Sequence, residues 1–428
     1  MLVILPTGGG KSLVFQLPAW IEKGKTTVVM IPFVALLEEM QERCEDLGLS
    51  CYSWRNSDAL SGPPQTQILL VAVEHAVSQD FQQFLIQIES TQRLTRIVLD
   101  ECHVVIGHRE FRDVLRRLAS VIRCVSVQLI SLTATLPVEM EERLQIILGC
   151  ERWQVIRKKG ERPEIKYKIE ILSEVRSRRD LNREVGKLLR SKLSEFEGND
   201  RAIVYCLQRD WADELAQYLN ERFEEQICMT YHAKMDISER RKAYTSWKEG
   251  DVLVLIGTSA LGAGIDHSGV RLVIHHGHAK SMVDFCQETG RAGRDGNPAE
   301  AVTLFWPNIV QSTSWINHED RDGVLKWIRG TGCKRATIGK YLNGVELNCL
   351  SMAKGELCSH CERVIESIGI RAMNTRRSNV KRGMGLAEKE IRMGTDLKEM
   401  ISELRGRCTL CWVLKRKGFD SHKLEKCK

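Results

Sequence analysis

The first twelve residues, MLVILPTGGGKS, constrain the fold of this chain more than any other stretch. Residues 2–5 are a short run of aliphatic and β-branched side chains, which is typical of a strand buried in a parallel sheet. The three glycines at 8–10 have no Cβ atoms, so the backbone there can come close to an anion. Lys11 and Ser12 then open a segment, LVFQLPAW, that can begin a helix. A strand, a glycine loop and a helix in this order predict an α/β domain with a parallel sheet.

This arrangement is a cradle for phosphate groups. Backbone N–H groups and the positive end of the helix hold the phosphates, Lys11 reaches their outer oxygens, and Ser12 ligates Mg²⁺. The usual first glycine of G-x-x-x-x-G-K-[ST] is Leu5 here, and a glycine-rich turn with an incidental lysine is the alternative reading. The predicted nucleotide-binding residues of the loop are Thr7, Gly8, Gly9, Gly10, Lys11 and Ser12.

Two adjacent carboxylates, Asp100 and Glu101, follow a short apolar strand predicted at 96–99. Polar residues at the carboxyl ends of parallel strands lie where an open α/β sheet binds its ligand. An aspartate at this place holds Mg²⁺, directly or through water, and the adjacent glutamate can polarise the attacking water. A solvated pair of surface carboxylates is the alternative.

A second unit of alternating strands and helices is predicted from about 165 to 310, with strands at 201–206 and 251–256. Trp211, Leu215 and Leu219 have helical spacing, which is typical of a core-facing stripe. An arginine reaching from a second lobe would stabilise charge in the transition state only when the lobes close. Arg291 and Arg294 in the stretch QETGRAGRDG fit that role, with Gln287 beside them as the third predicted catalytic residue of this stretch.

The net charge of +7 is concentrated at the C-terminal end of the chain. Residues 362–428 carry 17 basic and 9 acidic side chains, so the preceding body is nearly neutral. A basic tail on a neutral body predicts contact with a polyanion, most often nucleic acid, and a merely solvated tail is the alternative. No apolar run approaches the ~18 residues of a membrane span, and the N-terminus lacks the charged region of a signal peptide. We therefore expect a soluble intracellular protein without a membrane partner.

Three stretches resemble the motifs of a known family. PTGGGKS, DECH and SLTATLP, in this order, resemble motifs I, II and III of the superfamily 2 helicases, and of the RecQ-like DNA helicases in particular. Residues 257–271 and 287–296 resemble motifs V and VI, and Arg162-Pro163 with Tyr167 between the lobes also resembles the RecQ pattern. The resemblance covers roughly residues 1–361.

The resemblance implies a fold and an activity. The fold would be two RecA-like parallel-sheet lobes, a small helical zinc-binding module and the basic tail. ATP and Mg²⁺ would lie between the lobes, with Gly264 and Asp266 as further nucleotide-binding residues, and Thr133 and Thr135 would couple hydrolysis to lobe movement. Single-stranded or partly duplex DNA would be the partner, movement would run 3′ to 5′, and the nucleus would be the location.

The cysteines are divided between scattered positions and spaced clusters. Eight of the fifteen lie before residue 333 and are interpreted as buried small apolar residues. In an intracellular protein the others are thiols or metal ligands rather than disulfides. Cys333, Cys349, Cys358 and Cys361 have the spacing C-x15-C-x8-C-x2-C, which favours a zinc site of the RecQ kind over ordinary buried cysteines.

A second set near the end, Cys408, Cys411, His422 and Cys427, has the spacing C-x2-C-x10-H-x4-C. It resembles a zinc knuckle with a longer middle segment, and the two-cluster ending is similar to certain fungal RecQ-like proteins, including telomere-linked ones. A plain basic tail without metal is the alternative. The expected domains are therefore lobe 1 at 1–155, lobe 2 at 156–320, the zinc module at 321–366 and the tail at 367–428.

Two features of the RecQ pattern differ in this sequence. The upstream segment whose glutamine reads adenine is not present, so we expect the phosphates alone to hold the nucleotide. After DECH the sequence VVIGHREFR lacks the tryptophan of the family's aromatic-rich loop, and the residues after Cys361 are too few for a winged-helix domain. Hydrolysis is thus better supported than unwinding. The alternatives are a catalytically impaired relic that binds nucleic acid with zinc, and an RNA helicase.

Overall fold

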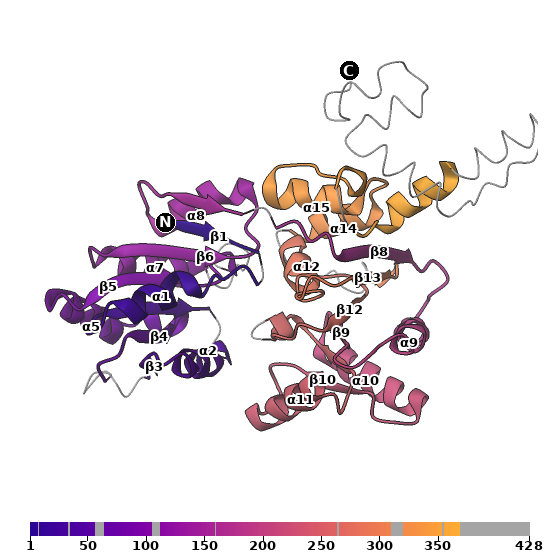
Figure 1. The fold of residues 1–428 in the computed structure, drawn as a ribbon, viewed down its shortest axis with the longest axis horizontal. Coiled ribbons are helices and arrows are strands. Elements are labelled where there is room, and N and C mark those ends of the chain that lie inside the picture. The colour runs from indigo at the N-terminus through magenta and orange to yellow at the C-terminus, as the bar shows by residue number, and fades with distance from the viewer. Residues whose placement is uncertain are drawn as a thin grey trace, which may run out of the picture.

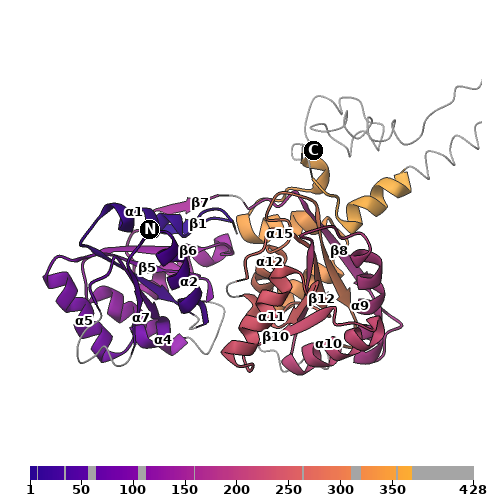
Figure 2. The same ribbon diagram turned by 60° about the horizontal axis from the view of Figure 1, so that its bottom comes forward.

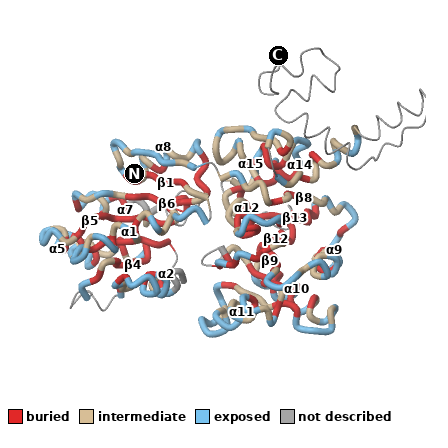
Figure 3. Tube along the Cα trace, in the orientation of Figure 1, coloured by how far each residue is buried: buried red, intermediate tan, exposed pale blue. Residues whose placement is uncertain are grey.

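The computed structural model describes residues 1–6, 8–32, 35–55, 64–104, 112–158, 160–262, 265–309, 320–352 and 355–368. Two α/β lobes lie side by side, and a small helical module lies against the second lobe with one helix next to the first (Figures 1 and 2). The predicted fold class is therefore confirmed over these residues. The central strands of both sheets are buried, whereas the outer surfaces of the helices are exposed (Figure 3).

The sheet of lobe 1 has seven strands, and every pairing between them is parallel. Its strands are β1 (Leu2–Ile4), β2 (Thr26–Ile31), β3 (Cys51–Ser53), β4 (Ile68–Ala72), β5 (Leu94–Leu99), β6 (Gln128–Thr133) and β7 (Val155–Arg157). Its helices are α1 (Leu13–Ile21), α2 (Ala35–Asp46), α4 (Val73–Ala76), α5 (Gln79–Ser90), α7 (Arg112–Arg123) and α8 (Glu141–Leu148). The predicted domain boundary at residue 155 falls in β7, which pairs with β1.

The strand order is β3-β4-β2-β5-β6-β1-β7. It places the phosphate loop after β1, the acidic pair after β5 and the Thr133 motif after β6 at the carboxyl end of the sheet. Since β6 lies between β1 and β5, the loops after these three strands are neighbours. Successive side chains of a strand point to opposite faces. Accordingly, Leu2 and Ile4 belong to the core on one face, whereas Val3 packs with Phe15 of α1 on the other. Burial on both faces explains why β1 has no polar residue.

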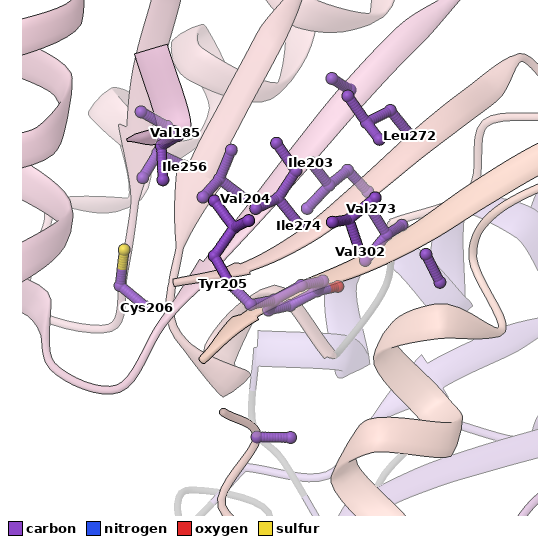
Figure 4. Close-up of a cluster of buried hydrophobic side chains, with 14 of the residues drawn as sticks. Val185, Ile203, Val204, Tyr205, Cys206, Ile256, Leu272, Val273, Ile274 and Val302 are labelled. Carbon is purple, nitrogen blue, oxygen red and sulfur yellow. The ribbon is translucent and has the colours of Figure 1, made fainter. Parts of the chain in front are cut away.

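The sheet of lobe 2 has six parallel strands in the order β10-β11-β9-β12-β13-β8. They are β8 (Ile165–Ile171), β9 (Arg201–Cys206), β10 (Cys228–Tyr231), β11 (Val254–Gly257), β12 (Val270–His276) and β13 (Ala299–Phe305). The helices are α9 (Arg178–Leu193), α10 (Arg209–Phe223), α11 (Ile237–Glu249) and α12 (Met282–Thr289). Figure 4 shows the core formed by Ile203 and Val204 of β9 beside Val273 and Ile274 of β12.

The predicted helical stripe of lobe 2 is confirmed, and one cysteine prediction is wrong. Trp211, Leu215 and Leu219 are buried on α10. Among the scattered cysteines, Cys124 is exposed, because it follows the end of α7 at the surface of lobe 1. It therefore contributes nothing to a core. No helix among the described residues is long and apolar enough to span a membrane.

The helical module after lobe 2 consists of α14 (Arg321–Arg329), α15 (Lys334–Asn343), a short 3₁₀ turn at Cys349–Ser351 and a helical segment at 359–368. Trp327 of α14 packs on Phe285 of α12, with ring centroids 4.3 Å apart. Lys334 is buried and its Nζ donates to the carbonyls of Trp327, Ile328 and Gly330, which places a cation at the C-terminal end of α14. The module is thus fixed to lobe 2 through α12.

Two buried histidines of lobe 2 should lower the free energy of unfolding of this lobe in weak acid. Burial lowers the pKa of His276 and of His278 to about 4, below the ~6.5 of an unfolded chain. As the pH falls below about 6.5, the unfolded state takes up protons first, so stability is lost between there and pH ~4. We expect each histidine to lower the free energy of unfolding by about 2 kcal/mol from pH 7 to pH 5.

Amide hydrogen exchange of β12 at the two pH values measures this loss for lobe 2 alone. His276, which bonds the Asn182 side chain at 2.8 Å, is replaced in a matched variant, His276→Gln. That variant has only one of the two titrations and should lose about half as much stability between pH 7 and pH 5. An equal loss in the variant and the wild-type chain would contradict the assignment to His276.

Candidate active site between the two lobes

The predicted phosphate loop has a backbone that only glycine tolerates. Gly8 and Gly10 have φ angles of +77° and +81°, in the left-handed region that favours glycine. A Cβ on Gly9 would lie 2.7 Å from the Pro6 carbonyl oxygen, which accepts the Gly9 N–H at 2.8 Å. Ser12 is the residue that precedes α1, so the loop leads directly into the helix N-terminus, as predicted. Thr7 lies outside the described residues.

The acidic pair lies at the end of β5, next to the phosphate loop. The Asp100 N–H donates to the Met30 carbonyl at 2.9 Å, and the Cys102 N–H donates to the Leu132 carbonyl at 2.9 Å. These bonds fix the turn to β2 and β6. Glu101 has a φ of +45°, which is rare for a residue with a side chain. Such backbone outliers cluster at functional sites, because the surroundings must hold them in place.

The two carboxylates have opposite pKa shifts. Burial and the neighbouring Glu101 charge raise the pKa of Asp100, and Lys11 opposes them. Burial also acts to raise the pKa of Glu101, but the hydrogen bond from His103 and the charge of Lys11 outweigh it and lower that pKa. Asp100 is thus a buried carboxyl whose raised pKa a bound cation would lower, which fits the role of a metal ligand. Ser12 and Asp100 fit Mg²⁺, whose preferred ligands are oxygens.

His103 connects the acidic pair to lobe 2. Its Nδ1 lies 2.7 Å from Thr133 Oγ1 and 3.3 Å from Glu101 Oε2, and its Nε2 lies 2.7 Å from Gln287 Nε2. A neutral ring with its proton on Nδ1 donates to the oxygens and accepts from the Gln287 amide. Sequence reasoning did not single out His103, although its place after Asp100-Glu101 was a signal. It joins three predicted motifs across the two lobes.

The two predicted arginines are packed against the loop after β11. The Arg291 guanidinium is buried and donates to the Ile265 carbonyl at 2.5 Å, and Arg294 pairs with Asp266. The charge of Arg291 contributes to the lowered pKa of Glu101, so it lies within electrostatic range of the acidic pair. Asp266, predicted to bind nucleotide, binds Arg294 here, and Gly264 lies outside the described residues.

The four spaced cysteines converge into one cluster. Their sulfur atoms all lie within 4.8 Å of one another, and Cys333 Sγ is 3.6 Å from Cys349 Sγ. Thiolates bound about 2.3 Å from a tetrahedral zinc ion lie about 3.8 Å from one another, so the cluster fits zinc. The N–H of Lys334 donates to Cys358 Sγ at 3.4 Å, which is the kind of outer contact that orients a metal ligand. Cys408, Cys411, His422 and Cys427 lie outside the described residues.

Two family models match the chain, one for each lobe. The DEAD/DEAH box helicase model matches residues 1–143, and the helicase conserved C-terminal domain matches residues 182–296. The first matched region contains the phosphate loop and the acidic pair, and the second contains Gln287, Arg291 and Arg294. The chain therefore carries the two domains that form a helicase core.

The chain is also similar to curated helicases and to solved helicase structures. ATP-dependent DNA helicase Q-like 2 of Arabidopsis thaliana is 30% identical over 388 residues, covering 84% of this chain and 52% of that protein. ATP-dependent DNA helicase RecQ of a Synechocystis species is 32% identical over 337 residues, covering 75% and 66%. The DEAD-box helicase Mss116 bound to single-stranded RNA has a TM-score of 0.61 at 15% identity, covering 75% and 69%. DUF1998 helicase MrfA bound to DNA has a TM-score of 0.60 at 17% identity, covering 79% and 50%. The chain spans about half to two thirds of the length of these two curated relatives.

Proposed function

We propose that this chain, which carries both helicase domains and is similar to RecQ-type DNA helicases, hydrolyses Mg-ATP between its lobes to move 3′ to 5′ along single-stranded DNA. The observation that carries this proposal is the contact of Gln287 with His103 at 2.7 Å. It holds the loop of Arg291 and Arg294 close to the acidic pair and thus assembles one site from both lobes. Hydrolysis would then depend on the relative position of the lobes, as a motor requires.

Each residue of the site has a distinct role in this proposal. Lys11 and the loop N–H groups bind the phosphates, and Ser12 and Asp100 hold Mg²⁺. Glu101, kept ionised by His103, orients and polarises the attacking water. Arg291 leaves the Ile265 carbonyl when the lobes close and neutralises charge on the transferred phosphoryl group, with Arg294 beside it. Bound Mg²⁺ supplies charge neutralisation at the phosphate oxygens.

The substrate, the tail and the location are part of the same proposal. DNA is favoured over RNA because the curated relatives quoted above are DNA helicases. The basic tail, with its second set of metal ligands, adds a contact to the phosphate backbone. A DNA substrate implies action where the genome lies, which in a eukaryotic cell is the nucleus.

Steady-state ATP hydrolysis, measured with no nucleic acid, with single-stranded DNA and with single-stranded RNA, tests the proposal. We expect stimulation by DNA of at least about tenfold, and displacement of a duplex only from a 3′ overhang. Lys11→Ala should remove the activity, whereas Lys23→Ala, which changes an exposed lysine beyond α1, should not. Stimulation by RNA alone would support the RNA helicase instead. DNA binding by a folded chain without hydrolysis would support the impaired relic.

A further inference from the structure

Arg162, which lies just before lobe 2, binds the backbone of the loop that carries the two arginines of the site. Its guanidinium donates to the Gly290 carbonyl at 2.8 Å and also to the Ala292 carbonyl. These two carbonyls flank Arg291 on either side. The Arg162 side chain is only 14% exposed, so both hydrogen bonds are shielded from water and fix the backbone firmly.

Glu164 completes this contact on the other side of Arg162. Its carboxylate pairs with the Arg162 guanidinium, and its side chain is 12% exposed. A Cβ on Gly293 would lie 2.9 Å from Glu164 Cγ, so the loop runs directly against the pair. Gly293 has a φ of +60°, and its N–H donates to the Val270 carbonyl at 2.9 Å. We call Arg162 and Glu164 the loop brace.

The helical module contacts the loop brace through Arg335. Arg335, two residues after Cys333, donates to the Arg162 carbonyl, and it bonds the Ile165 carbonyl at 2.6 Å and the Glu356 carbonyl at 2.9 Å. Its guanidinium also lies 5.3 Å from the ring of Tyr167 on β8. Arg335 is buried, so this contact is a fixed part of the structure. The four-cysteine cluster, the loop brace and the arginine loop therefore form one continuous set of contacts.

We infer that Arg162 is a positioning residue for hydrolysis: it sets the place of Arg291 relative to the phosphates, and Arg335 links that placement to the helical module. The inference rests on the proposed function. Arg162 itself touches only protein atoms, whereas Arg291 would touch the phosphoryl group. A displacement of about 1 Å at such a group costs up to about a hundredfold in rate.

Kinetics of Arg162→Gln in the full chain test this inference. We expect kcat for DNA-stimulated hydrolysis to fall about 10- to 100-fold, with KM for ATP changed by less than about threefold. Affinity for ADP–aluminium fluoride, which mimics the transition state, should fall with kcat, while affinity for a fluorescent ATP analogue should not. Arg162→Lys keeps the charge with fewer donors and should lie between Arg162→Gln and the wild type.

A double variant distinguishes a positioning role from a general structural one. If Arg162 acts through the arginine loop, Arg162→Gln with Arg291→Ala should be no slower than Arg291→Ala alone. Lys166→Gln is the matched control, because Lys166 lies on β8 nearby but pairs with Glu362 and not with the loop. A kcat of Arg162→Gln within twofold of the wild type, or losses that multiply in the double variant, would overturn the inference.

Hydrogen exchange tests the loop brace independently of activity. Amides of residues 288–296 should exchange faster in Arg162→Gln than in the wild type or in Lys166→Gln, because the loop loses its two bonds. A wild-type chain without ATPase activity would defeat the proposed function but leave this exchange test intact. Unchanged exchange in an active chain would defeat the loop brace alone.

Discussion

Glu101→Gln is expected to lower kcat for ATP hydrolysis roughly a thousandfold while leaving the affinity for Mg-ATP nearly unchanged. Glutamine has the size of glutamate, but its amide cannot accept a proton from the attacking water. His103 and Lys11 keep the pKa of Glu101 low, so the wild-type residue is ionised at neutral pH and able to polarise that water. Single-turnover hydrolysis and the binding of a fluorescent ATP analogue measure the two quantities separately.

Two further variants define what this result would mean. Asp100→Asn changes the predicted metal ligand and should weaken Mg²⁺ binding as well as hydrolysis. Glu142→Gln changes an exposed glutamate on α8 and should leave both unchanged. If Glu101→Gln kept more than about a tenth of the wild-type kcat, another group would have to orient the water, and the assignment of Glu101 would be wrong.

Buried parallel strands were the part of the fold that the sequence predicted best. Residues 2–5, 26–31 and 201–206 are rich in aliphatic and β-branched side chains because both faces of each strand are covered, and the structure has strands there. By contrast, β8 reads IKYKIEI, with lysines and a glutamate on one face, because it lies at the edge of its sheet. That alternating pattern gave no strand prediction. The stretch from Val125 to Leu132 predicts a further strand, but the strand in the structure, β6, begins only at Gln128.

The candidate site was predictable where its chemistry is local in sequence. Lys11 with Ser12, and Asp100 with Glu101, are adjacent residues that follow predicted strands, and local order alone indicated their roles. The contact of His103 with Gln287 joins residues 184 positions apart, and Arg162 reaches carbonyls 128 and 130 positions away. Such contacts arise from the packing of one lobe or module on another. A single sequence has no periodicity or spacing that indicates them.

The four-cysteine cluster was predictable for a different reason. Zinc is bound by a small set of residue types, often with two ligands a few positions apart, so the spacing of the cysteines in the sequence indicates the site. The contact of Arg335 with the loop brace had no such signature, because an arginine that binds backbone carbonyls needs no particular partner residue. The positions of Cys333 and Arg335 on one short segment then explain why the module can act on the site at all. At one end of α15 the Lys334 N–H donates to Cys358 Sγ, and at the other end the Leu342 carbonyl accepts from Arg157 of lobe 1 at 2.9 Å.

Cys358→Ser is expected to remove a zinc ion from the chain and to destabilise the helical module by several kcal/mol. Free zinc-finger peptides gain about 10–16 kcal/mol from the metal, but this module also packs on lobe 2 through Trp327 and Phe285 and should keep part of its structure. Loss of the cluster should therefore loosen α15 and, through Arg335, the arginine loop, without unfolding the sheet of lobe 2. Zinc released per chain and hydrogen exchange of residues 334–343 measure the two effects.

Cys124→Ser is the matched control for the zinc experiment, because Cys124 is exposed and remote from the cluster in sequence. It should release the same zinc as the wild-type chain. Two zinc ions per wild-type chain would place the second in the set Cys408, Cys411, His422 and Cys427, and Cys408→Ser should then lose one ion while Arg335 stays in place. One ion per chain, lost in Cys358→Ser, would assign the metal to the first cluster alone. If the wild-type chain bound no zinc, the four sulfur atoms would be held together by packing, and the module's effect on the arginine loop would have to act through Arg335 without a metal.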